Sequence, residues 1–134
     1  EGAFGGCTAL TTVTIGGSIH SIEEGAFGGC TALTTVTIGG SVQSIEEGAF
    51  EGCTALITMT IGGLVTYIDG GAFKGCSALT AFTILGPVGE KDRVDIHDRA
   101  FEGCSALTTV TIDGLATPVG DLANKYPYIR GMAD

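Results

Sequence analysis

The chain has 134 residues and a formal net charge of −9, with 44% hydrophobic residues, 7% aromatic residues and no Trp. This acidic balance disfavours nucleic acid and anionic membranes as partners, because both carry negative charge. No apolar run approaches the roughly 18 residues that a bilayer span needs, so we expect no membrane insertion in this segment. The length fits one ordinary domain with a continuous core.

One phrase recurs five times: Ala-Phe, two variable residues, Cys, two residues, Leu, two residues, an apolar residue, Thr, Ile. The copies begin at Ala3, Ala26, Ala49, Ala72 and Ala100, with spacings of 23, 23, 23 and 28 residues. Residues 1–23 and 24–46 differ only where Ile19 and His20 become Val42 and Gln43. A fixed period of this length predicts a stacked array, in which each unit buries its apolar face only against its neighbours.

Within one unit, Ala26, Phe27, Cys30 and Leu33 recur at helical spacing and predict a short helical turn. The next segment, residues 34–38, alternates between polar and apolar residues and predicts a strand. Its Val and Ile would point inward and its Thr outward.

After the strand, Gly39-Gly40 forms a corner, and Val42 and Ile45 supply a second, shorter apolar edge that closes the coil. We therefore predict a solenoid over residues 1–116, with five coils of about 23 residues that start near residues 1, 24, 47, 70 and 98. Residues 117–134 would form a degenerate C-terminal capping segment.

The pattern Ala-Phe-x-x-Cys-x-x-Leu-x-x-Val-x-Ile, followed by Ser-Val-x-x-Ile, resembles the BspA-like (Treponema pallidum-type) leucine-rich repeat over residues 1 to about 116. The resemblance implies a leucine-rich-repeat solenoid with parallel β-strands on one face and short helical turns. It also implies a secreted or cell-surface protein that adheres to matrix proteins or other cells, and it supplies no catalytic set. The chain departs from the family pattern at Gly16, Gly39 and Gly62, where Pro is usual, and in an insertion in the fourth unit.

The five cysteines occur once per unit, so stacking would place them in one column: Cys7, Cys30, Cys53, Cys76 and Cys104. Neighbours about 4.8 Å apart are within reach of a disulfide, but equivalent side chains project in parallel and an odd number leaves one unpaired. No Cys-x-x-Cys occurs, and the only His residues are His20 and His97, so a zinc site is poorly supported. We predict buried free thiols that act as small hydrophobes, with no metal and no cofactor.

Acidic residues also form columns. Glu1, Glu24 and Glu47 share one repeat position, and Glu23, Glu46 and Asp69 share the next. Stacked carboxylates are suited to calcium, although Gly70 interrupts the first column. The interpretation we prefer is a solvated edge, with calcium binding as the alternative.

A Thr-x-Thr motif recurs in the strands and would form a grid with steps of about 4.8 Å between coils and nearly 7 Å along a strand. Thr35, Thr37, Thr58 and Thr60 are the candidate ligand-binding residues at its centre. The grid resembles those of β-solenoid antifreeze proteins, which raises ice binding as an alternative. The β-propensity of Thr accounts for the same pattern without a ligand, and curvature of the sheet would disturb a lattice match.

Two further segments hold candidate ligand-binding residues. The insertion at residues 85–99 carries Lys91, Arg93 and His97, and insertions in solenoids map to surface loops that often bind ligands. A tolerated difference in loop length is the alternative. The C-terminal segment carries Tyr126 and Tyr128.

The first coil begins directly with a regular unit, so we expect it to expose an apolar face that either upstream repeats or another chain would cover. Self-association through this coil is therefore a further hypothesis. Taken together, the residues predict a non-enzymatic protein-interaction or adhesion module that binds a protein or glycan. The alternatives are a structural repeat spacer of a larger surface protein, or a calcium- or ice-binding solenoid.

Overall fold

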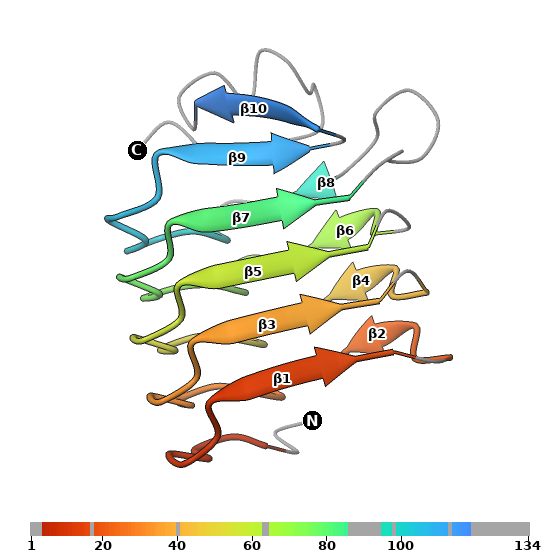
Figure 1. Ribbon diagram of the computed structural model, residues 1–134. Helices are drawn as coiled ribbons and strands as arrows, with labels where there is room; N and C mark the ends of the chain where they lie inside the picture. The colour runs from red at the N-terminus through yellow and green to blue at the C-terminus, as the bar shows by residue number, and fades with distance from the viewer. Residues whose placement is uncertain are drawn as a thin grey trace.

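The computed structural model describes residues 4–16, 18–39, 41–62, 65–85, 95–97, 99–112 and 114–118. In this part of the chain, successive repeats stack into a solenoid with two sheets that enclose one core (Figure 1). The long strands of the larger sheet lie above one another in chain order, and the short strands of the smaller sheet lie behind them. The predicted solenoid of stacked repeats is confirmed.

The larger sheet has the strand order β1-β3-β5-β7-β9-β10. Its strands are β1 (Thr12–Ile15), β3 (Thr35–Ile38), β5 (Thr58–Ile61), β7 (Ala81–Ile84), β9 (Thr109–Ile112) and β10 (Leu115–Pro118). The first five strands are parallel and pair equivalent repeat positions, such as Val36 with Met59 and Met59 with Phe82. Because the register follows the repeat, every apolar strand position lies over the same position of the next coil.

The residue directly after β3, β5 or β7 extends the hydrogen-bonded ladder between coils. The Gly39 N–H donates to the Ile15 carbonyl at 2.6 Å, and the Gly62 N–H donates to the Ile38 carbonyl at 2.9 Å. A proline has no N–H to donate. Leu85 at the equivalent position donates to the Ile61 carbonyl at 2.7 Å, so this bond excludes proline but does not require glycine.

The smaller sheet contains four parallel two-residue strands in the order β2-β4-β6-β8. They are β2 (Ser21–Ile22), β4 (Ser44–Ile45), β6 (Tyr67–Ile68) and β8 (Asp95–Ile96). Their isoleucines are buried and meet the residues of the larger sheet in one core. The predicted second apolar edge is thus a short sheet of its own.

The predicted helical turns are wrong: the described residues contain no helix, and tight turns occupy those positions. The N–H groups of Phe27 and Gly29 donate to Ala49 and Glu51 of the next coil at 2.7 and 2.8 Å. The alternate N–H groups of Gly28 and Cys30 donate to carbonyls three residues back, at 3.1 and 3.3 Å, which is the pattern of successive turns. Gly29 has φ of 75°, a left-handed conformation that interrupts a helix and favours glycine.

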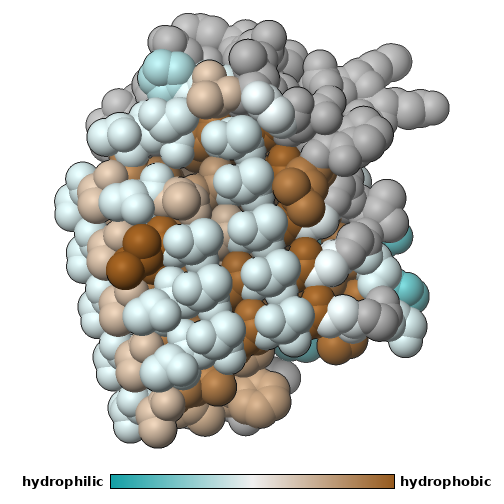
Figure 2. Space-filling view, in the orientation of Figure 1, coloured by the Kyte–Doolittle hydropathy of each residue, from teal (hydrophilic) through white to brown (hydrophobic). Residues whose placement is uncertain are grey.

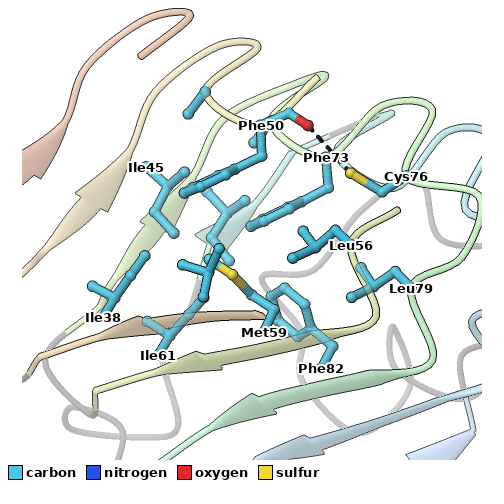
Figure 3. Close-up of a cluster of buried hydrophobic side chains, with 14 of the residues drawn as sticks. Ile38, Ile45, Phe50, Leu56, Met59, Ile61, Phe73, Cys76, Leu79 and Phe82 are labelled. Atoms are coloured by element: carbon cyan, nitrogen blue, oxygen red, sulfur yellow. Dashed lines mark hydrogen bonds between the residues drawn. The ribbon is translucent and has the colours of Figure 1, made fainter. Parts of the chain in front are cut away.

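The tight turns of successive coils form one edge of the solenoid, which we call the turn edge. Phenylalanine rings form a continuous column behind it. Neighbouring rings from Phe4 to Phe101 are stacked with centroids 5.2–5.5 Å apart and planes within 7° of each other. Figure 3 shows Phe50 above Phe73, with Met59 and Phe82 reaching them from the strands. Phe82 contacts the column edge-on, with its centroid 5.2 Å from that of Phe73. Offset stacks and edge contacts of this kind add to the free energy gained from burial.

The fifth unit does not complete a coil as predicted. After β9 the chain turns back through Gly114, which has φ of 80°, and β10 pairs antiparallel with β9. Asp-Gly is a strong signal for a two-residue hairpin turn, because its geometry needs left-handed backbone. The sequence therefore carried a hairpin signal at residues 113–114. Beyond residue 118, the predicted capping segment lies outside the described residues.

The phenylalanine column yields a prediction about stability. Phe50 is fully buried and stacks on both sides, whereas Phe4 is 51% exposed. Replacing Phe50 with Ala should lower the free energy of unfolding by about 3–5 kcal/mol, the range for large-to-small changes in a core. Phe4→Ala is the matched control and should lower it by less than half as much. Denaturant titration with circular dichroism measures both, and equal losses would contradict the proposed packing.

Candidate functional site

The exposed side of the larger sheet presents three columns of residues, which we call the threonine face. The column before the strands holds Thr11, Thr34, Ile57, Thr80 and Thr108; the next holds Thr12, Thr35, Thr58, Ala81 and Thr109; the third holds Thr14, Thr37, Thr60, Thr83 and Thr111. All fifteen side chains are exposed or half-buried, while the intervening Val36, Met59 and Phe82 are buried. The predicted inward and outward positions of the strands are therefore confirmed.

The four threonines singled out from the sequence lie together at the centre of this face. Thr35 pairs with Thr58, and Thr37 pairs with Thr60, on the adjacent strands β3 and β5. They form the corners of a small rectangle of hydroxyl and methyl groups. The structure thus brings these four predicted residues into one surface.

The threonine face has no charged side chain among its described residues, although the chain as a whole carries a net charge of −9. The outward residues of β10, Ala116 and Pro118, are uncharged as well. Figure 2 shows pale columns on this face with brown beside them, and the deeper teal of hydrophilic residues lies at the margins. The acidic groups are therefore placed on other sides of the solenoid.

Two aliphatic side chains stand out from this surface. Ile57 is 48% exposed where four other units have Thr, and Leu85 is 50% exposed directly after β7. Ala81 interrupts the second column on the strand next to Ile57, and its N–H donates to the Ile57 carbonyl at 3.1 Å. The two breaks in the threonine columns are thus neighbours. Ile57 was not among the residues predicted from the sequence, although it stands at a repeat position where the four other units have Thr.

The predicted cysteine column is present, and all five thiols are free. Four of them donate to the carbonyl of a phenylalanine in the preceding coil, as in Cys53 Sγ to Phe27 O at 3.2 Å and Cys76 Sγ to Phe50 O at 3.2 Å (Figure 3). The pattern repeats for Cys30 and Cys104. Burial raises the pKa of the Cys30 thiol, and the thiols of Cys104 and Cys53 together with burial raise that of Cys76.

These contacts predict how the thiols react. Cys7 is only half-buried, whereas the other four are buried. Since a reagent must reach the sulfur and burial restricts its access, one thiol should react quickly with a disulfide reagent and four slowly. Denaturant should release all five. The Cys7→Ser variant should lose the fast phase alone, and a fast phase that persists in it would contradict this assignment.

The raised thiol pKa values also predict a dependence of stability on pH. The folded state holds the protons of Cys30 and Cys76 at pH values above the ordinary thiol pKa of 9.0. The stabilisation that these two thiols give the folded state is therefore complete below pH 9.0 and declines as pH rises further. Each of these two thiols contributes a slope of at most about 1.4 kcal/mol per pH unit in that range. The hydrogen bond with Cys76 lowers the pKa values of Cys53 and Cys104, so those two thiols add nothing to the decline. Urea titrations at pH 8 and pH 10 measure the decline. The Cys30→Ala/Cys76→Ala variant should show a smaller decline, and an equal one would contradict the thiol origin.

The acidic columns line the turn edge of the solenoid. Glu24, Glu47 and Glu51 border a shallow groove whose floor consists of glycines. In the next column, Glu46 accepts hydrogen bonds from Ser44 at 2.8 Å and Ser21 at 3.5 Å, and Asp69 accepts one from the Gly70 N–H at 2.7 Å. Within the described residues, no three His, Cys, Asp or Glu side chains are grouped so that they could hold a metal ion. Glu1 lies outside those residues.

His97 is separate from the threonine face. It follows β8 in the smaller sheet, and its ring lies edge-on to Tyr67 with centroids 4.8 Å apart. Its backbone N–H continues the ladder by donating to Ile68 at 2.9 Å. The structure therefore does not bring His97 together with the four predicted threonines.

The other predicted ligand-binding residues are Lys91, Arg93, Tyr126 and Tyr128, and all four lie outside the described residues. At the N-terminal end, Phe4 and Ile19 are about half exposed, at 51% and 47%.

No helix in the described part of the chain has the length and hydropathy needed to cross a bilayer.

Comparison with known proteins identifies the repeat. Residues 1–127 match the BspA type Leucine rich repeat region, in six copies, one more than the five cysteine-containing phrases. A leucine rich cell surface protein from Faecalibacterium prausnitzii, solved by crystallography, is similar with 17% sequence identity and a TM-score of 0.38. The match covers 98% of the present chain and 65% of that protein. No curated protein matches the chain. Because the family match extends over nearly all its residues, the chain belongs to the BspA-type leucine-rich-repeat family.

Proposed function

We propose that the chain is a non-enzymatic interaction module of a secreted or cell-surface protein, and that it binds a protein partner through the threonine face. Membership of the BspA-type family supports an interaction role. We choose this surface because Ile57 is exposed beside Ala81, in an array of threonines without charged side chains. Adhesion to matrix proteins or to other cells is the biological role we infer for this binding.

The chemistry of the face favours a protein over a glycan. Sugar rings are commonly held by stacking on aromatic side chains, and the described residues of the threonine face include none. An aliphatic side chain surrounded by small, uncharged neighbours is instead suited to an apolar contact at the centre of a protein interface. Ile57 would be buried by the partner, and the surrounding threonines would exclude water from the contact.

The uncharged face also bears on how binding should respond to salt. An interface without ion pairs gains little from long-range attraction, so its affinity should be nearly independent of ionic strength. A partner recruited by Lys91 and Arg93 of the insertion would behave differently and would dissociate as salt is added. Salt dependence therefore separates the two candidate surfaces.

The test uses a panel of purified extracellular matrix proteins and measures affinity by surface plasmon resonance. Ile57→Lys should weaken binding at least tenfold, because the lysine charge would have to be desolvated in the contact. Ile19→Lys is the matched control, since Ile19 is 47% exposed and Ile57 48%. This control should bind as the parent does. Equal affinities for all three chains would contradict a role for the threonine face.

The same panel addresses the other candidates. The Lys91→Glu/Arg93→Glu variant should keep its affinity if the threonine face binds, and should lose it if the insertion binds. A spacer would bind none of the panel and would leave cell adhesion unchanged when its coils were replaced by those of an unrelated solenoid. Self-association through the first coil would appear as a concentration-dependent mass that Phe4→Lys reduces.

A further inference from the structure

We propose that the threonine face also binds an ordered lattice of water, the surface of ice. This goes beyond the proposed protein-binding function, because the ligand has no side chains and the recognised feature is the spacing of the array. Three observations carry it: the strict register of the columns, the absence of charge among the described residues of the face, and the rigid layer directly beneath it.

The spacing of the array is close to that of tetrahedral water. Adjacent strands lie about 4.8 Å apart, and alternate residues along a strand about 6.6 Å apart. Water molecules hydrogen-bonded at roughly 2.75 Å in tetrahedral geometry place second-neighbour oxygens about 4.5 Å apart and give an axial repeat of about 7.3 Å. Across five strands the mismatch along the stack accumulates to about 1 Å, a fraction of one lattice repeat. The array is thus nearly commensurate with the lattice over its whole length.

The register makes this match possible. Thr14 pairs with Thr37, Thr37 with Thr60, Thr60 with Thr83, and Thr83 with Thr111, so one column of hydroxyls runs unbroken across five strands. The five long strands keep nearly the same direction from β1 to β9 (Figure 1). A strongly fanned sheet would have turned the column away from the lattice direction.

The composition of the face suits ordered water. Each threonine presents a hydroxyl, which both donates and accepts hydrogen bonds, and a methyl group, which orders water without binding it. Charged groups hold their own hydration shells, and none lies on the described face. Beneath it, Val36, Met59 and Phe82 are at most 1% exposed, so the strands cannot easily shift. The threonines are therefore held in position before the ligand arrives.

The neighbouring breaks at Ile57 and Ala81 supply a test by gain of function. Replacing both with Thr would complete the first two columns without adding a charge. An ice-binding face should improve through this repair. A face that holds a protein through Ile57 should lose affinity through the same change, so the two functions predict opposite effects.

The experiment measures inhibition of ice recrystallisation and adsorption to a growing ice surface, with the whole chain and serum albumin as the inactive reference. The parent chain should inhibit, and Ile57→Thr/Ala81→Thr should need less protein for the same effect. Thr37→Lys should require about tenfold more protein, because the lysine charge would lose water at the contact. Thr66→Lys is the control: Thr66 is exposed and precedes β6 of the smaller sheet. It should inhibit as the parent does.

Circular dichroism melts of all variants establish that they are folded before they are compared. A parent chain no more active than albumin overturns the proposal, and so does equal inhibition by Thr37→Lys and Thr66→Lys. Both results would leave protein binding unaffected, because that function is measured separately with Ile57→Lys. Conversely, loss of matrix binding in Ile57→Lys with no ice activity in the parent would support the protein-binding function alone.

Discussion

Each coil is joined to the next by backbone hydrogen bonds on all three of its sides, and this registers every repeat position with its equivalent. The larger sheet pairs Val36 with Met59, the smaller sheet pairs Ile45 with Ile68, and at the turn edge the Phe27 N–H donates to Ala49. A slip by one residue would place polar side chains in the core. The strict period of the sequence is the condition for this register, and the other features of the molecule follow from it.

The buried columns are the first consequence. The carbonyl of each phenylalanine from Phe4 to Phe73 accepts a hydrogen bond from the cysteine thiol of the next coil at 3.1–3.2 Å. The rings themselves stack along the same line, so one turn segment supplies both a packing contact and a polar contact between coils. Cysteine is small enough to remain in this column and can still donate to the carbonyl. Neither a metal nor a disulfide is needed to explain why each unit has one.

The distribution of charge is the second consequence. Because equivalent residues form columns, a polar preference repeated in each unit becomes a property of a whole side of the solenoid. The glutamates collect along the turn edge, while the outward strand positions are occupied almost entirely by threonine. A single substitution in one unit then makes one position of an otherwise uniform surface chemically different. Ile57 and Ala81 are two such positions, and they lie close together because adjacent strands stack.

The sequence by itself determined the period, the inward strand residues such as Val36 and Ile38, and the burial of four of the five cysteines, because these depend on a repeated pattern of polarity. Only the tertiary structure decided that the Phe27 segment is a turn, since alternate N–H groups of this segment donate to the next coil. It also decided that β10 folds back on β9, and that His97 lies apart from the threonine face. Hydrogen bonds between coils and distances across the stack do not appear in a local pattern, so these features depended on the assembled fold.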